Sequence, residues 1–235
     1  MQPDATSGRQ ASVAPDPSVQ PLFRIRTFRS AVNGNFLTRL GIGGIPFLFP
    51  LLYQIGLGLT PIQSGLLMMP QAIAAMSLKM TMPGILAKVG YRGVLISNTP
   101  VIGLLIFVFS TIGRNTPIWL IVAEVFCYGF FMSLQYTSIN TLVFADVTDE
   151  AASSASSIAS TVQQLSITFG IATASLLTVF FLPARFQSNP LEFIGGVHKA
   201  FYVLGGMTLL STIVFFELKK RDGDAVSEGK TLHAA

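Results

Sequence analysis

TPIWLIVAEVFCYGFFMSLQYTSINTLVF, residues 116–144, decides the fold of this chain, because the segment is apolar on nearly every side and long enough to cross a bilayer. A helix needs about 20 residues to span ~30 Å of hydrocarbon. A soluble helix of this length would keep one polar face, which lipid surroundings do not require. Five further blocks share this character, at residues 36–59, 64–87, 93–113, 155–182 and 200–216. The sequence therefore predicts an all-α, polytopic membrane protein, a bundle of six transmembrane helices.

The composition argues against several other classes of protein. With 51% hydrophobic residues, 11% charged residues and a mean hydropathy of +0.60, the 235-residue chain has too few charges for a soluble globule. The net charge of +4 does not indicate nucleic-acid binding, because the basic residues stand at block ends, where lipid headgroups lie. A single cysteine, Cys127, and two histidines outside the blocks, His198 and His233, predict no metal site, no cofactor and no intramembrane enzyme.

The distribution of Lys and Arg predicts the orientation of the bundle. Eight of these residues fall on one side of the membrane: Arg24, Arg26, Arg29, Lys88, Arg92, Lys219, Lys220 and Arg221. Three fall on the other side: Arg114, Arg185 and Lys199. The positive-inside rule then places both termini in the cytoplasm of a multi-pass plasma (inner) membrane protein. The bundle would occupy residues 23–218, between a disordered cytoplasmic tail at 1–22 and a second cytoplasmic tail at 219–235.

Polar side chains are distributed unevenly among the blocks. The fourth block carries one helical stripe that is expected to face the bundle interior: Glu124, Tyr128, Phe131, Gln135 and Ser138. The fifth block repeats this pattern with Ser157, Ser160, Gln164 and Thr168, and the second contributes Gln71 and Lys79. These polar stripes predict a wet cavity lined by Gln71, Glu124, Tyr128, Gln135 and Gln164. Blocks three and six, with Asn98 as their one strongly polar side chain, are expected to be outer, lipid-facing helices.

Several of these residues have two interpretations. Serine and threonine hydroxyls often join membrane helices by hydrogen bonds, and this role is favoured for them over substrate contact. Glu124 is a candidate for protonation or for a substrate path, because an unpaired carboxylate is costly in hydrocarbon, although a structural role is equally open. Lys79 and Arg39 stand near the ends of their blocks and are expected to snorkel toward the interface.

The first block is rich in glycine and proline, including Gly43, Gly44, Pro46 and Pro50. Such a helix is expected to kink. Freed backbone groups are tolerated in membranes where neighbours or cavity water satisfy them, so this block is a candidate gating helix. Close helix packing through the small residues is an equal alternative.

Four segments resemble the drug:proton antiporter branch of the major facilitator superfamily. The longest of these segments is similar to the region of the tenth and eleventh helices of the twelve-helix core; it is YGFFMSLQYTSINTLVFADVTDEAASSASSIASTVQQLS, residues 128–166. FRIRTFRSAVNGNFLTRLGIGGIPFLFPLLYQ, residues 23–54, resembles the seventh helix, and QSGLLMMPQA, residues 63–72, the eighth. GILAKVGYRGV, residues 84–94, resembles the cytoplasmic loop motif of the superfamily.

The resemblance implies a fold of two inverted three-helix repeats, the C-terminal half of a transporter, in which the first and fourth helices line the cavity. In the loop motif, Gly84 would allow close packing, Gly90 a tight turn and Arg92 a cytoplasmic contact. Lys88 stands where the better-kept copy of the motif has Asp, which weakens the case for a gating salt bridge here. Alternating access in this superfamily requires that one half move against the other, so a single half would need an N-terminal six-helix half or a second copy of itself.

The predicted function is half of a secondary-active transporter, for proton-coupled efflux of small amphipathic compounds once it is assembled with another six-helix bundle. Glu124, Tyr128 and Gln135 would line the substrate side, and Glu124 is the possible protonation site. The alternative is a non-transporting membrane interaction protein or a truncated remnant, whose presence would change the accumulation of no compound. A channel is weakly supported, because the chain has no loop that resembles a selectivity filter.

Overall fold

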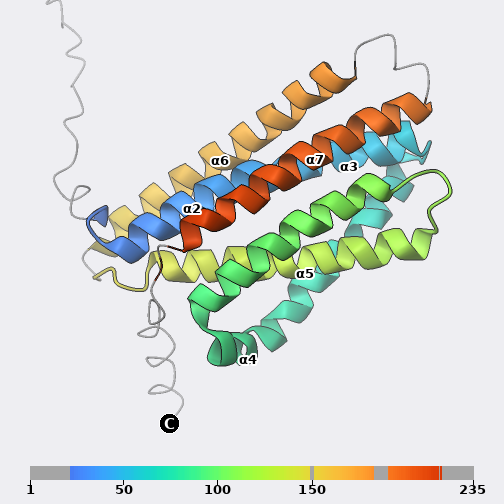
Figure 1. The fold of residues 1–235 in the computed structure, drawn as a ribbon. Helices are drawn as coiled ribbons and strands as arrows, with labels where there is room; N and C mark the ends of the chain where they lie inside the picture. Colours follow the sequence, from blue (N-terminus) through green and yellow to red (C-terminus); the bar gives the residue numbers. More distant parts are fainter. Residues whose placement is uncertain (1–21, 149–150, 183–189, 217, 219–235) are drawn as a thin grey trace, which may run out of the picture.

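The computed structural model describes residues 22–148, 151–182, 190–216 and 218, and within these the chain is helical, with no strand. The cytoplasmic tail predicted at 219–235 and all but Leu22 of the tail predicted at 1–22 lie outside the described residues. The elements, in order, are α2 (Arg26–Ile42), α3 (Ile45–Pro50), the π-helical turn η1 (Leu51–Gly56), α4 (Pro61–Val108), the 3₁₀ turn η2 (Phe109–Thr111), α5 (Ile118–Val143), α6 (Ala152–Phe181) and α7 (Pro190–Phe215). Figure 1 shows them as one elongated bundle, and the prediction of an all-α fold is confirmed.

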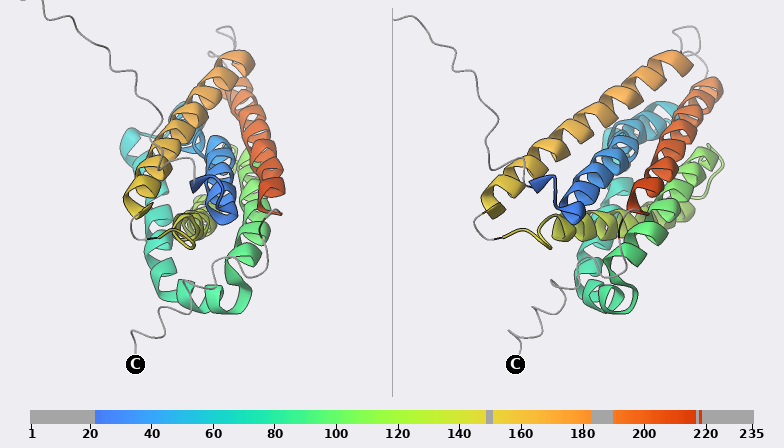
Figure 2. Two further views of the ribbon diagram at one scale, coloured as in Figure 1. Left: turned by 90° about the vertical axis from the view of Figure 1, so that its left-hand side faces the viewer. Right: turned by 60° about the vertical axis from the view of Figure 1, so that its left-hand side comes forward.

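Five segments among the described residues are long and apolar enough to cross a membrane: Thr27–Gly56, Lys88–Thr111, Ile118–Val143, Ala152–Phe181 and Leu191–Phe215. The remaining predicted block, 64–87, is also helical and forms the first part of α4, but it is not among the five. Gln71 and Lys79 lower the hydropathy of that part. A kink at Gly90, with φ 70° and ψ 163°, separates it from the second part of α4. Figure 2 shows the two parts diverging from this turn.

Two helices begin earlier than the apolar blocks predict. The first span starts at Thr27 rather than at residue 36, and the last at Leu191 rather than at residue 200. The reason is that a helix continues through polar residues as long as its backbone bonds are satisfied, whereas an apolar block ends at the first polar turn. Arg39 consequently lies near the middle of its span, and the expectation that it stands near the end of the membrane-spanning block is wrong.

The predicted interruption of the first helix is confirmed at Gly43 and Gly44, between α2 and α3. A Cβ on Gly44 would lie 2.6 Å from the Cβ of Ala174 and 2.9 Å from the carbonyl oxygen of Gly170, both on α6. Any larger side chain here would therefore push α6 away. The π-helical turn that follows Pro50 adds a second irregularity to this span, and such turns often accompany functional sites.

Aromatic side chains fill the centre of the bundle. Phe49 packs edge-on against Phe109, with ring centroids 4.8 Å apart, and Phe109 packs against Tyr128 at 5.3 Å. These rings come from α3, η2 and α5, so one cluster joins elements that are distant in the sequence. Edge-to-face pairs of this kind stabilise a core beyond the area that they bury.

α6 is the least covered of the five spans and lies at one edge of the bundle in both figures. Only 17% of its most apolar stretch is buried, against 61% of the corresponding stretch of Thr27–Gly56. Lys88–Thr111 and Leu191–Phe215, the blocks expected to be outermost, are 50% and 44% buried. Within this chain, exposure therefore does not follow the predicted order.

Buried polar bonds join the helices at two places. Gln135 on α5 accepts a hydrogen bond from the Asn98 Nδ2 atom at 2.8 Å and donates one to the Thr99 Oγ1 atom at 2.7 Å, both on α4. The hydroxyls of Thr38 and Ser211 join α2 to α7 at 3.2 Å. Hydroxyls on α6 behave differently, because each donates to a backbone carbonyl of its own helix. The donors are the hydroxyls of Ser157, Thr161, Thr168, Thr173 and Thr178.

Candidate functional site

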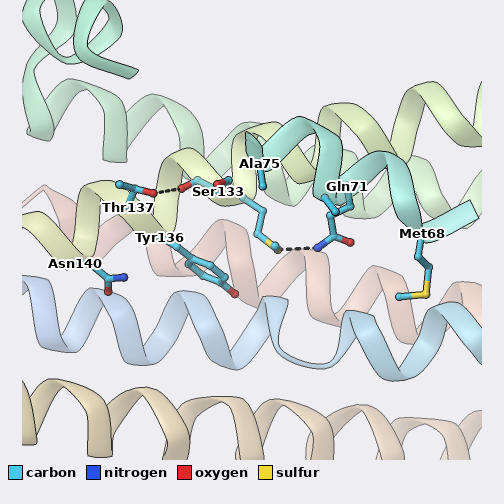
Figure 3. A pocket seen from close by; sticks show the side chains of 9 residues that line it. Met68, Gln71, Ala75, Ser133, Tyr136, Thr137 and Asn140 are labelled. Carbon is cyan, nitrogen blue, oxygen red and sulfur yellow. Dashed lines mark hydrogen bonds between the residues drawn. The ribbon is translucent and has the colours of Figure 1, made fainter. Parts of the chain in front are cut away.

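A pocket of about 290 Å³ lies between the first part of α4 and the middle of α5. The side chains that matter most for its chemistry are Met68, Gln71, Met132, Tyr136 and Asn140. Figure 3 shows the Gln71 amide turned toward the Met132 sulfur, which it contacts at 3.7 Å. The pocket thus combines polarisable apolar walls with amide groups, the mixture that suits an amphipathic ligand.

The helix crossing beside the pocket depends on Gly129. A Cβ at this position would lie 2.6 Å from the Gln71 Cα atom and 2.8 Å from the Gln71 carbonyl oxygen. Those are backbone atoms, which cannot rotate away. Gly129 therefore sets how closely α4 and α5 approach and how the pocket above them is shaped.

Arg39 is the buried charge nearest to this pocket. Its side chain is 3% exposed, and its Nε atom donates to the Asn35 Oδ1 atom one turn earlier on α2. Its guanidinium carbon lies 3.8 Å from the centroid of the Tyr136 ring, which in turn lines the pocket. In Figure 3 the Tyr136 ring projects from α5 toward α2. The prediction that Arg39 snorkels is wrong, because the side chain turns into the bundle.

A second polar group of residues lies nearer the start of α5, within the aromatic core. Glu124 is 7% exposed, and its Oε1 atom has no hydrogen-bond partner among the described residues. The hydroxyls of Tyr128 and Tyr53 are likewise buried without a partner, and Tyr53 interacts electrostatically with Glu124. Glu124 and Tyr136 are about 18 Å apart along the helix axis at ~1.5 Å per residue, so these are two distinct places.

The structure does not bring the five predicted cavity residues together. Gln71 lines the pocket between α4 and α5, whereas Glu124 and Tyr128 lie in the buried core. Gln135 is fully buried and bonded to Asn98 and Thr99, and Gln164 is exposed on α6. The predicted α5 stripe is nonetheless turned inward, since Glu124, Tyr128, Gln135 and Ser138 are all buried and Phe131 is half-buried.

The residues of the loop motif lie around the kink of α4. Gly90 adopts a φ of 70°, a conformation that favours glycine, at the position where the resemblance implies a tight turn. A Cβ on Gly84 would meet nothing within 4 Å, so the described residues offer no close packing there. Arg92 is half-buried, and its Nε atom has no hydrogen-bond partner in the described part of the chain.

The sequence predicts Arg39 only as a snorkelling residue and gives Asn35 and Tyr136 no role. An arginine in the middle of a span is rare and marks a functional site by default. This signal depends on where the span begins, because a block that begins at residue 36 leaves Arg39 near its end. A misplaced helix start also affects His198, which was expected outside the blocks but lies in α7, half-buried, with its Nε2 atom 2.9 Å from the Ile112 carbonyl oxygen.

Metal chemistry has little support in the described ranges, which contain no group of three or more His, Cys, Asp or Glu side chains that could hold an ion. The arrangement instead offers a small amphipathic pocket, a buried cation and a buried acid in a helical membrane bundle. These are the features of a multi-pass helical membrane protein with polar groups in its interior, the class that the fold and the site define together.

Comparison with known proteins identifies the family. The profile described as Major Facilitator Superfamily matches residues 2–171, and the chain belongs to this superfamily. Its members are membrane transporters and not enzymes, which agrees with the prediction that the chain is not an enzyme.

Similar proteins bear the name multidrug resistance protein MdtD. The chain is 35% identical over 156 residues to the one from Serratia proteamaculans (strain 568), which covers 66% of this chain and 33% of the relative. It is 31% identical over 197 residues to the one from Pectobacterium atrosepticum, covering 84% of this chain and 41% of the relative. For the one from Escherichia coli O9:H4 (strain HS) the identity is 36% over 160 residues, covering 68% of this chain and 34% of the relative. The matched stretches therefore span between 33% and 41% of the length of these relatives.

Proposed function

We propose that this chain is one six-helix half of a secondary-active transporter, which exports small amphipathic organic compounds with proton coupling when it is assembled with another six-helix bundle. The second bundle is an N-terminal half or a second copy of the chain. The assembly lies in the inner membrane with both termini of this chain in the cytoplasm, as the distribution of Lys and Arg indicates.

The uncovered polar face of α6 is the observation that carries this proposal. Ser157, Ser160, Gln164 and Thr168 are all exposed on a helix of which only 17% is buried. The hydroxyls of Ser157 and Thr168 bond within α6, but a glutamine amide in hydrocarbon remains costly. A wet cavity or a second bundle satisfies this amide, whereas lipid does not.

The pocket between α4 and α5 supports an amphipathic substrate. Met68 and Met132 offer flexible apolar contacts, and Gln71 and Asn140 offer hydrogen bonds that fix orientation. At about 290 Å³ the pocket matches the lower end of ligand sites, so it holds one part of a compound whose remainder would contact the second bundle.

Glu124 is proposed as the proton-carrying group of this half. It is buried, and its Oε1 atom has no hydrogen-bond partner in the described part of the chain. It acts on Tyr53, which belongs to the irregular η1 turn. An acid in such surroundings is stable when it is protonated or hydrated and unstable otherwise, so a change in helix packing would release or bind its proton. The MdtD relatives, named for multidrug resistance, support efflux as the direction of transport.

The test is efflux in inverted membrane vesicles that contain this chain together with the second six-helix bundle. A lipophilic dye is supplied, a proton gradient is imposed, and uptake into the vesicles is recorded. The proposal expects dye uptake that collapses with the gradient and that Glu124→Gln abolishes. Glu192→Gln, at an exposed carboxylate in the first turn of α7, is the matched control and is expected to retain uptake.

Two results would contradict the proposal. Dye uptake that is equal with and without the chain would favour the non-transporting alternative. Gradient-driven uptake that survives Glu124→Gln would remove Glu124 from the mechanism and leave proton binding to the other bundle.

A further inference from the structure

Arg39 is a buried cation without a counter-charge in the described part of the chain. It is 3% exposed, and the interactions of its guanidinium are a hydrogen bond to Asn35 and a stack on Tyr136. Neither partner is acidic. The buried acid Glu124 does not compensate for it, because Glu124 lies about 18 Å along α5 from Tyr136, the residue that stacks on Arg39.

A lone cation at this depth is unfavourable unless something compensates for it. The stack on a tyrosine ring recovers part of the lost hydration, and the bond to Asn35 satisfies only one of five N–H donors. The remaining N–H donors form the planar fork that matches the oxygens of carboxylate, sulfonate and phosphate groups. The described protein atoms leave this fork unused.

The guanidinium of Arg39 is separated from the pocket between α4 and α5 by one side chain, Tyr136. Tyr136 belongs to both places, since its ring covers Arg39 and lines the pocket together with Gln71 and Met132. A compound that rests its apolar part against Met132 would bring a polar end to the region of Tyr136 and Arg39. The charge of Arg39 favours a negative end over a neutral or positive one.

We infer that the cluster of Arg39, Asn35 and Tyr136 is an anion-recognition site, and that the compounds handled by this half are amphipaths with a carboxylate, sulfonate or phosphate group. This inference rests on the proposed function, because it names the class of compound that the transporter takes. Asn35 holds the guanidinium in place, and the Tyr136 ring positions it next to the pocket.

The test compares two fluorescent probes that differ only in their anionic group, N-phenylnaphthylamine and anilinonaphthalene sulfonate. The purified chain is placed in nanodiscs of zwitterionic lipid, and the affinity for each probe is measured by fluorescence after subtraction of empty nanodiscs. The inference expects the sulfonated probe to bind about tenfold more tightly, the scale of charge-assisted hydrogen bonds. Equal affinity for the two probes in the unmodified chain would overturn it, whatever the variants do.

The variants assign the preference to Arg39. Arg39→Gln is expected to lose the tenfold preference and to keep the affinity for the neutral probe within a factor of two. Arg39→Lys is expected to restore part of the preference, because it keeps the charge without the planar fork. Arg29→Gln is the matched control, since Arg29 lies on the same helix but is exposed, and it should retain the full preference.

Other outcomes distinguish a substrate anion from a lipid headgroup, and distinguish failure of this inference from failure of the proposed function. A preference that survives Arg39→Gln would overturn the inference. Loss of probe binding when phosphatidylglycerol replaces the zwitterionic lipid would assign the site to a lipid headgroup and overturn the substrate class. Binding that depends on Arg39, with no gradient-driven uptake in the vesicle assay, would refute the proposed function and leave the anion site standing.

Discussion

Gly129→Ala is expected to force α4 and α5 apart and to destabilise the bundle. The new Cβ would lie 2.6 Å from the Gln71 Cα atom, whereas two carbon atoms pack at about 3.5–4.0 Å, so the helices must separate by about 1 Å. Overpacking of this kind typically costs about 1–3 kcal/mol. Because the neighbouring atoms belong to the backbone, rotation of a side chain cannot relieve the contact.

The matched control is Gly206→Ala in α7, where a Cβ would meet nothing within 4 Å. Both substitutions gain the same helix propensity, about 0.8–1.0 kcal/mol in soluble helices, so this contribution cancels when the two variants are compared. The free energy of unfolding of each variant in mixed micelles, measured by titration with a denaturing detergent, should differ by about 1–3 kcal/mol. If Gly129→Ala proves as stable as Gly206→Ala, the close crossing of α4 and α5 at Gln71 is refuted.

Three further predictions concern single residues. Gly90→Ala should lower the free energy of unfolding by about 1–3 kcal/mol, because alanine is strained at φ 70°. Gly84→Ala should not lower it, because a Cβ at Gly84 meets nothing within 4 Å, and the same detergent titration compares the two variants. Gln135→Leu should cost about 1–2 kcal/mol, because it removes the bonds of Gln135 to Asn98 and Thr99 and leaves Asn98 with its bond to the Phe131 carbonyl oxygen alone between these helices. Gln164→Leu on the exposed face of α6 serves as its control in thermal unfolding. Tyr53→Phe should leave thermal stability unchanged or raise it, because it removes a buried hydroxyl that has no hydrogen-bond partner among the described residues. A marked loss of stability would mean that the hydroxyl is bonded in the membrane.

The helical class and the inward face of α5 could be predicted from the sequence, because both depend on local periodicity. The offsets that place Glu124, Tyr128, Gln135 and Ser138 on one side of a helix hold whatever the neighbours are. The partners of that face could not be predicted. Gln135 bonds to Asn98 and Thr99 rather than lining the pocket, and nothing in the spacing of either helix specifies this pairing.

Helix starts were the other source of error. Residues 27–35 contain polar side chains and were excluded from the first block, although they continue the α2 helix. A block that begins at residue 36 puts Arg39 near the end of the span, where snorkelling is possible, whereas the span that begins at Thr27 puts it near the middle. The buried cluster of Arg39, Asn35 and Tyr136 could not be predicted from the sequence for this reason, because Tyr136 and Asn35 gain their significance only from a buried Arg39.

The claim that a second bundle covers the polar face of α6 is tested most directly by photo-crosslinking in native membranes. A photoreactive amino acid replaces exposed Gln164 on α6, and in a parallel sample it replaces Leu210, 67% exposed on α7. The account predicts that the probe at Gln164 joins the chain to a second six-helix bundle, recognised by mass as a second copy or as an N-terminal half, while the probe at Leu210 labels lipid. Labelling of lipid alone at Gln164 would contradict the account.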